Sequence, residues 1–178
     1  MDLGVISVRY ARAVLKCADE QKLEEKVYKE IQTLSQSYLE VPQLRFTIDN
    51  PILQNATKEQ LLAQACGGEV SELTRKFIAI VLHKDRGNAL QFMAASYITL
   101  YRRQKNIIQG TLTTATKVSQ KTEDKMKQMV EAKTHGTVEF NTQVDPSIIG
   151  GFILEYDTYR MDASVKTKLN TILNELKN

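Results

Sequence analysis

The 178-residue sequence contains no tryptophan, two cysteines, two histidines and three prolines. Two cysteines are too few for a disulfide framework. Because Cys17 and Cys66 both lie in helical patterns, we expect reduced thiols in the core of a cytosolic protein rather than a bridge. The longest uninterrupted apolar run, residues 77–82, is far below the roughly 20 residues that span a bilayer. The first residues lack the basic and apolar regions of a secretory signal, so we expect no targeting segment.

The sequence also lacks the motifs of common enzymatic chemistry. Neither GxxxxGK(S/T) nor GxGxxG occurs, and the two cysteines do not have metal-ligand spacing. His83 and His135 are far apart, and we expect surface or capping roles for them. Asp162 and Ser164 could suggest part of a catalytic triad, but no histidine is near them and a helix cap accounts for both. We therefore predict a protein without an active site, a cofactor or a metal; a small hydrolase has no supporting constellation.

The charge balance is close to even. The chain has 24 Lys and Arg against 21 Asp and Glu, a net charge of +3 that is too small to indicate nucleic-acid binding by itself. The densest basic cluster, residues 102–105, is better explained as the favourable end of a helix. A basic helical module that binds RNA or the ribosome stays open as an alternative, and it would bind with a strong inverse dependence on salt.

The first part of the chain has helical periodicity throughout. A hydrophobic content of 42% supports a packed core, and the length allows one ordinary domain or two small ones. Thr57, with Gln60 three residues on, fits a capping box that would begin the fourth helix. The segments expected to be helical are residues 3–20, 22–40, 42–49, 57–66, 70–84 and 88–105. Short connections favour an antiparallel arrangement, so we predict an all-α six-helix bundle over residues 1–106.

After Gly110 the period changes. Residues 112–116 and 138–144 are rich in Thr, Val and Phe and predict strands, and residues 119–133 between them predict a helix. Two further strands are expected at residues 152–156 and 159–161, joined by a tight turn at Asp157 and Thr158. Ser164 or Asp162 can cap a closing helix whose apolar residues are Val165, Leu169, Ile172, Leu173 and Leu176. Residues 107–178 thus predict a small α+β domain.

Two of the predicted helices carry more apolar surface than one core contact requires. The first helix has two apolar stripes. One consists of Leu3, Ile6, Tyr10, Ala13, Val14 and Cys17, and the other of Val8, Ala11, Leu15 and Ala18. The fifth has a face of Leu73, Phe77, Ile80 and Val81, which Ile78 and Leu82 widen. Either these helices are central in the bundle and buried on both sides, or they form an exposed groove for a partner's amphipathic helix. Periodicity does not separate these explanations.

Three motifs give the chain a family resemblance. They are the opening Ile6-Ser-Val-Arg-Tyr10-Ala-Arg-Ala13-Val-Leu, the loop Lys84-Asp-Arg86-Gly-Asn88-Ala-Leu90, and the closing pair Gly150-Gly151 with Met161-Asp-Ala-Ser-Val165. The chain resembles the δ subunit of bacterial F-type ATP synthases, whose mitochondrial counterpart is the oligomycin-sensitivity-conferring protein. The resemblance covers the whole chain, and the closing motif is its most specific part.

The resemblance implies a non-catalytic stator subunit, which ties the catalytic head to the peripheral stalk so that rotor torque is coupled to ATP synthesis. The N-terminal bundle would bind the N-terminal helix of an α subunit, and the C-terminal domain would contact the b subunits. By resemblance Tyr10, Ala13 and Ile80 would contact the α helix, and the apolar pattern adds Val14, Ile78 and Leu82. Gly150, Gly151, Asp162 and Ser164 would be structurally indispensable to the C-terminal domain. The implied complex holds one copy, without nucleic acid, peripheral on the cytoplasmic face of the bacterial inner membrane and attached there only through other subunits.

Overall fold

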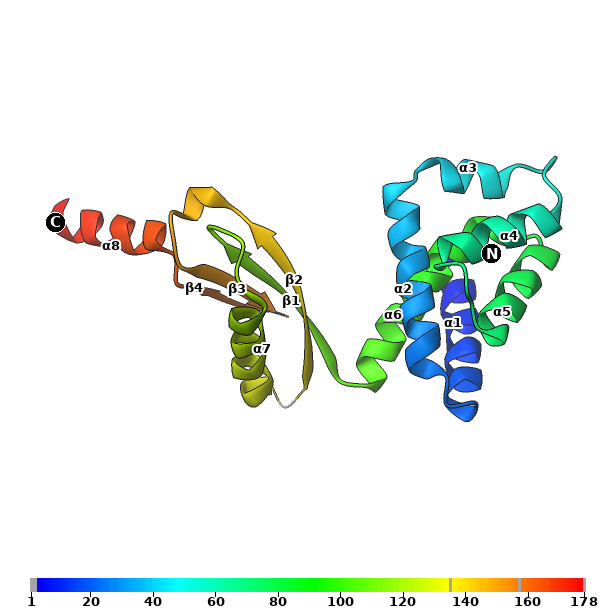
Figure 1. Ribbon diagram of the computed structural model, residues 1–178, viewed down its shortest axis with the longest axis horizontal. Helices are drawn as coiled ribbons and strands as arrows, with labels where there is room; N and C mark the ends of the chain where they lie inside the picture. The colour runs from blue at the N-terminus through cyan, green and yellow to red at the C-terminus, as the bar shows by residue number, and fades with distance from the viewer. Residues whose placement is uncertain (1–2, 135, 157, 178) are drawn as a thin grey trace. The chain divides into compact units, whose positions relative to one another are not determined.

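The computed structural model describes residues 3–134, 136–156 and 158–177 (Figure 1). The chain divides into two compact units, Met1–Arg103 and Gln104–Asn178, and each is described by itself. The first is helical and the second combines helices with a four-stranded sheet, as the sequence predicts at this level. His135 and Asp157 lie outside the described residues, so the role expected for His135 and the turn expected at Asp157 are not addressed. None of the described helices combines the length and apolar character needed to cross a bilayer.

The N-terminal unit consists of helices joined by short connections. Their bounds are α1 Leu3–Glu20, α2 Glu24–Glu40, α3 Gln43–Asp49, α4 Asn55–Ala65, α5 Glu72–His83 and α6 Leu90–Gln104, with a 3-10 turn η1 at Gly87–Ala89 before α6. The capping box predicted at Thr57 is wrong, because α4 begins at Asn55 and follows Gln54, which makes no side-chain cap. Asp85, in the left-handed region at φ 53°, follows α5 and its cap residue Lys84 and turns the chain toward η1.

The core of the N-terminal unit lies where α1, α2, α5 and α6 meet. Its most deeply buried large side chains include Ile31, Leu34, Ile78, Leu90 and Met93. Aromatic rings join α2 to α6, because Tyr28 stacks on Tyr101 with ring centroids 4.2 Å apart. Arg102 donates a hydrogen bond from Nε to the Tyr28 hydroxyl at 2.9 Å. The first two residues of the basic cluster at 102–105 therefore lie at the end of α6, as expected, and Arg102 also serves the packing.

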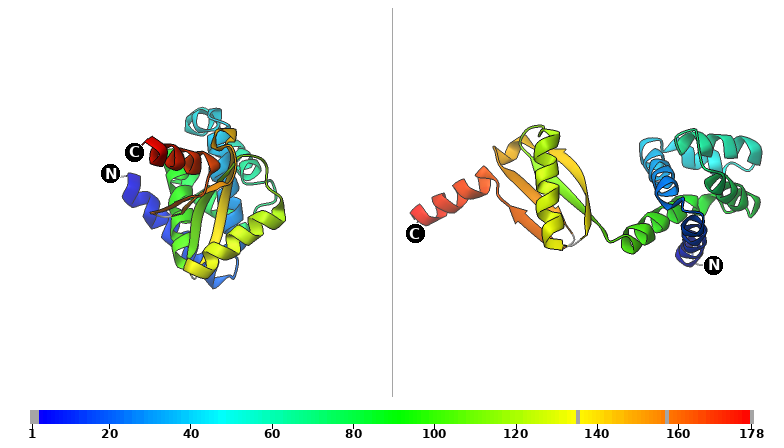
Figure 2. Two further views of the ribbon diagram at one scale, coloured as in Figure 1. Left: turned by 90° about the vertical axis from the view of Figure 1, so that its left-hand side faces the viewer. Right: turned by 60° about the horizontal axis from the view of Figure 1, so that its bottom comes forward.

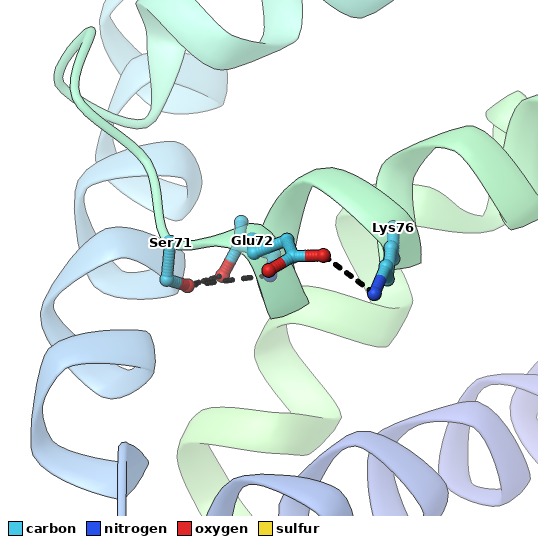
Figure 3. A network of polar contacts seen from close by, with 4 residues as sticks. Ser71, Glu72 and Lys76 are labelled. Atoms are coloured by element: carbon cyan, nitrogen blue, oxygen red, sulfur yellow. Dashed lines mark hydrogen bonds and ion pairs between the residues drawn. The ribbon is translucent and has the colours of Figure 1, made fainter. Parts of the chain in front are cut away.

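A buried carboxylate connects α2 to the beginning of α5. Glu30 is only 6% exposed and accepts hydrogen bonds from the backbone N–H of Ser71 (2.7 Å), the Ser71 hydroxyl (2.7 Å) and the Thr74 hydroxyl (2.5 Å). The Ser71 hydroxyl in turn accepts a hydrogen bond from the Thr74 N–H, the usual cap at the start of a helix. The exposed neighbour Glu72 instead pairs with Lys76 on the same helix, at 2.6 Å (Figure 3). Glu30 thus anchors the start of α5 from a different helix.

The C-terminal unit is a mixed sheet with strand order β2-β1-β3-β4. The strands are β1 Ile107–Thr114, β2 Thr137–Val144, β3 Phe152–Tyr156 and β4 Tyr159–Asp162. β1 pairs in parallel with β2 and antiparallel with β3, which pairs antiparallel with β4. Helix α7, Gln120–Thr134, connects the two parallel strands and covers one face of the sheet (Figures 1 and 2). Leu112, Val130, Val138 and Leu154 form the buried core between them.

The first strand differs from its predicted bounds. It was expected at 112–116 but begins at Ile107 and ends at Thr114. The sequence obscures this start because Gly110 interrupts the alternation. In the structure a Cβ at Gly110 would lie 2.9 Å from the ring of Phe140, so a glycine lets the neighbouring strand's aromatic side chain approach.

Helix α8, Val165–Lys177, closes the chain after β4. It contacts the 3-10 turn η2, Pro146–Ile148, and otherwise extends away from the sheet of its own unit (Figure 2). The apolar residues predicted to form one face of this helix are all exposed: Val165, Leu169, Ile172, Leu173 and Leu176. A helix with an unburied apolar stripe has surface available for another element.

Candidate partner-binding surfaces

Helix α1 divides its two apolar stripes between the core and the surface. Ala11, Leu15 and Ala18 of the second stripe are buried, and Val14 and Ser7 join them. The first stripe stays accessible over Leu3, Ile6, Tyr10, Ala13 and Cys17, of which Leu3 and Ala13 are exposed and the others half-buried. The surplus apolar surface of α1 is therefore not used up inside the bundle.

Helix α5 contributes less surface than the pattern suggested. Ile80 is 53% exposed, whereas Ile78 and Leu82 are buried. We define the α1/α5 face as Leu3, Ile6, Tyr10, Ala13 and Ile80, which lie on two helices that contact each other. Val14, Ile78 and Leu82, which were predicted to contact a partner, belong to the core beneath this face. They can shape the α1/α5 face but do not present their side chains on it.

Tyr10 is held in place by a residue that sequence reasoning did not assign to the site. Arg86, which follows α5, donates a hydrogen bond from Nη1 to the Tyr10 hydroxyl at 2.8 Å. Its guanidinium also lies 5.4 Å from the centre of the Tyr10 ring, within cation–π range. The two residues are 76 positions apart, so only the position of Arg86 in the Lys84–Leu90 motif could have drawn attention to it. Arg86 thus fixes one aromatic side chain of the α1/α5 face.

The Tyr10–Arg86 contact has a measurable energy. We expect Arg86→Met and Tyr10→Phe each to destabilise the N-terminal unit by about 1 kcal/mol, because either change removes the same half-buried hydrogen bond. The double variant should lose less than the sum of the single losses, with a coupling energy of about 1 kcal/mol. Urea denaturation of the four proteins measures this cycle. Strictly additive losses would contradict the interaction.

The closing motif forms the connection between the sheet and α8. The N–H of Val165 donates to the carbonyl of Gly150 at 2.9 Å, and that of Ala163 donates to Phe152 at 2.9 Å. Gly151 has φ +76°, and a Cβ there would lie 2.3 Å from the Ala163 carbonyl oxygen, so this position requires glycine. The structure therefore brings Gly150 and Gly151 against the segment between β4 and α8.

Of the two residues that could cap α8, Ser164 accepts a backbone N–H of the helix, and Asp162 supports this cap from β4. The Asp162 carboxylate accepts the N–H of Ser164 (2.9 Å) and the Thr167 hydroxyl (2.9 Å). The Ser164 hydroxyl accepts the N–H of Thr167 at 3.2 Å. The chemistry of Asp162 and Ser164 is that of a rigid helix start.

The cap makes the start of α8 sensitive to acid. Hydrogen bonds from Ser164 and then from Thr167 lower the pKa of Asp162 below its ordinary value. Because its pKa is lower in the folded protein, the ionised carboxylate stabilises the fold at pH values above the pKa of the unfolded state, about 4. This stabilisation is lost as the pH falls through the lower pKa of the folded state. We expect the Ser164 amide resonance to titrate with Asp162 below about pH 4 and to lose protection there. In Asp162→Asn the resonance should not titrate; an unchanged titration would contradict the cap.

Both thiols lie in the N-terminal unit, where Cys17 is half-buried and Cys66 is buried. Cys17 and Cys66 are free, and burial, followed by the charge of Glu30, raises the pKa of the Cys66 thiol to about 12. Cys66 is therefore an un-ionised thiol at neutral pH. Within the described residues, no three His, Cys, Asp or Glu side chains are placed to hold a metal ion together. What the structure offers is surface: the α1/α5 face in one unit and the apolar face of α8 in the other.

The sequence is similar to those of known proteins over nearly its full length. Residues 6–176 match the family described as ATP synthase delta (OSCP) subunit. The ATP synthase subunit delta of Phocaeicola vulgatus is 47% identical over 173 residues, which cover 97% of this chain and 94% of the relative. The subunit of the same name from Bacteroides thetaiotaomicron is 39% identical over 97% of this chain and 94% of the relative.

A solved structure shares the fold. A chain in the cryo-electron microscopy structure of the Toxoplasma gondii mitochondrial ATP synthase hexamer matches with a TM-score of 0.64 and 20% identity, over 97% of both chains. At this identity the likeness concerns the fold alone. The sequence relationships are much closer, and they extend over nearly the full length. The protein therefore belongs to the ATP synthase delta (OSCP) subunit family.

Proposed function

We propose that the protein ties the catalytic head of an F-type ATP synthase to the peripheral stalk through two separate apolar surfaces. As a member of the delta (OSCP) family it is a stator subunit, which links parts of the ATP synthase. In the proposal, the α1/α5 face binds the N-terminal helix of an α subunit, and α8 binds the b subunits. The exposed apolar face of α8, together with the accessible stripe of α1, is the observation that carries this division of roles.

The α1/α5 face suits an amphipathic helix. A helix that docks in a groove uses apolar residues at i, i+3, i+4 and i+7, and the accessible residues Leu3, Ile6, Tyr10 and Ala13 follow a similar helical spacing on α1. Tyr10 offers a large ring at low entropy cost because Arg86 already restrains it. The small Ala13 beside it leaves room for a partner's side chain. Burial of these residues predicts a negative heat-capacity change and weak salt dependence on binding.

The α8 face supports a helix–helix contact with the stalk. All five apolar residues of the helix are exposed, and Leu176 reaches 80%. The cap at Asp162 and Ser164 and the glycine pair fix the start of α8, so the helix is presented in a defined direction from its own sheet. A fixed direction reduces the entropy that a partner helix must remove on binding. The C-terminal motif would then act by positioning α8 rather than by touching the b subunits.

The proposed role of the protein is mechanical, and it constrains the rates at which its partners bind and dissociate. Torque on the head must be resisted over many turnovers, so slow dissociation counts more than fast encounter. Apolar helix contacts lose affinity mainly through dissociation when they are weakened. Two surfaces on one chain add avidity when both are engaged at once.

We expect one copy of the protein in each complex. It would be attached to the cytoplasmic face of the bacterial inner membrane only through other subunits. Membership of the ATP synthase delta (OSCP) subunit family supports this function over the RNA-binding alternative.

The α8 part of the proposal is tested on the full chain. We expect Leu173→Glu to weaken binding of a soluble C-terminal segment of the cognate b subunit by at least roughly tenfold, since a charge enters the apolar contact. Asn170→Glu introduces the same charge on the same exposed helix and should bind like the wild type. Calorimetric titration measures both, and circular dichroism verifies that the helix content is kept. Equal affinities of the two variants would place the stalk contact elsewhere.

A further inference from the structure

A polar cavity of about 420 Å³ lies at one end of the N-terminal unit, apart from the α1/α5 face. It is bordered by the end of α3, the start of α4, the end of α5 and the turn into η1, and it is partly open to solvent. Its lining consists of Ile48, Asp49, Pro51, Asn55, Lys58, Leu82, Asp85, Gly87 and Asn88. Cavities of this volume hold small organic ligands. The motif Lys84–Leu90, apart from Arg86, contributes three of these lining residues and has no role in the proposed stator function.

Lys58 is the unusual member of the lining. It is 8% exposed, although lysine is rarely so buried without a partner. Among the residues that the structure describes, none forms an ion pair or a hydrogen bond with the Lys58 side chain. The carboxylates of Asp49 and Asp85 are likewise not engaged in hydrogen bonds or ion pairs there. Lys58, which is largely buried, and the exposed residues Asp49 and Asp85 thus line one cavity with unpaired charged groups, and a ligand there can supply their partners.

The charges of the lining narrow the class of ligand. An anion alone would be attracted by Lys58 but repelled by Asp49 and Asp85. A divalent cation is disfavoured as well, because it would be repelled by the Lys58 ammonium and would find only two carboxylates, whereas such ions prefer six or more oxygen ligands. A ligand with a cationic and an anionic group can pair with the two carboxylates and with the Lys58 ammonium at the same time. A guanidinium suits the cationic pole because its planar fork can serve two carboxylates. The methylene groups between the poles can rest on Ile48 and Leu82, which are buried and apolar.

We propose that this cavity binds a basic amino acid with a free carboxylate, either the free amino acid or the C-terminal arginine of a peptide. Asp49 and Asp85 hold the guanidinium, and Lys58 holds the carboxylate. The net charge of these three side chains is −1, which is opposite to the +1 of free arginine at neutral pH, whereas the C-terminal arginine of a peptide has one charge of each sign. The side-chain amides of Asn55 and Asn88 supply further donors and acceptors.

The test is a titration of the ¹⁵N-labelled full chain with L-arginine, with agmatine, which lacks the carboxylate, and with N-acetyl-L-arginine, which resembles a C-terminal arginine. We expect saturable shifts of the amides of the cavity residues with L-arginine, and roughly tenfold weaker binding of agmatine. Equal binding of N-acetyl-L-arginine would identify the peptide end as an accepted source, and much weaker binding would identify the free amino acid. No saturable shifts, or equal affinities of L-arginine and agmatine, would overturn the proposal.

Two variants locate the effect. Lys58→Met keeps the buried aliphatic part of the side chain and removes the ammonium. It should therefore weaken the binding of L-arginine roughly tenfold, while the affinity for agmatine stays the same or increases. Asp85→Asn keeps a residue type that tolerates the left-handed backbone at this position and should weaken both ligands. Lys16→Met changes an exposed lysine on α1 and serves as the matched control, with unchanged binding. Loss of binding in Lys16→Met, or its retention in both cavity variants, would contradict the assignment.

Discussion

Replacing Glu30 with alanine should destabilise the N-terminal unit by about 3 kcal/mol. The change removes the acceptor for three donors, the Ser71 N–H and the hydroxyls of Ser71 and Thr74. These donors are buried, and an alanine leaves them without their partner at a cost of about 1–3 kcal/mol for each group that water cannot reach. The start of α5 would loosen from α2 as a result. Urea denaturation followed through amide resonances of α2 and α5 measures the loss in the unit concerned.

Glu72→Ala is the matched control for this prediction. Glu72 is the next residue after Ser71, but it is exposed and pairs only with Lys76 on the surface of α5. Solvent screens such pairs, so little change in stability is expected. Glu30→Gln should fall between the two variants, because an amide keeps one acceptor oxygen but loses the charge. If Glu30→Ala and Glu72→Ala had the same urea midpoint, the buried network would not stabilise the fold.

Ala13→Asp should abolish binding of the α-subunit N-terminal helix while the bundle stays folded. Ala13 is exposed in the isolated chain, so a carboxylate there is hydrated and costs the fold little. In the proposed complex the same carboxylate would be buried against an apolar helix without a partner charge, which weakens affinity by a hundredfold or more, about 3 kcal/mol. Calorimetric titration of the full chain with a peptide of the α N-terminal segment measures the effect.

Two other alanines separate loss of binding from loss of structure. Ala95→Asp places the same charge on the exposed side of α6, outside the α1/α5 face, and should bind the peptide like the wild type. Ala11→Asp places it at a fully buried position one turn from Ser7 and should unfold the bundle. Peptide binding by Ala13→Asp at wild-type affinity would mean that the α helix docks on another face.

Most helices and strands could be predicted from residue periodicity. The 3.6-residue repeat of apolar side chains placed α1 at residues 3–20 and α8 after Ser164, and alternation placed β3 at residues 152–156, all as the structure has them. Local signals were less reliable at boundaries. Thr57 and Gln60 suggested a helix start that the structure places two residues earlier, because Gln54 takes an extended conformation before Asn55.

The candidate surface was predictable only in part. A helical wheel assigned two adjacent stripes to α1 without showing which of them meets the core, and so it counted Val14 with Tyr10 and Ala13. On α5 the same ambiguity placed Ile78 and Leu82 beside Ile80. Contacts across long separations were beyond the sequence: Glu30 meets Ser71 over 41 positions, and Arg86 meets Tyr10 over 76. Such pairs form only when the helices pack against each other, and short-range sequence patterns do not predict that packing.

The central claim is that one chain holds the head and the stalk at the same time through different units. Its most direct test is sedimentation analysis of the full chain with both the α N-terminal peptide and the soluble b segment. The account predicts a ternary complex with one copy of the protein, from which Ala13→Asp removes only the α peptide and Leu173→Glu removes only the b segment. Competition between the two partners, or loss of both through either substitution, would contradict it.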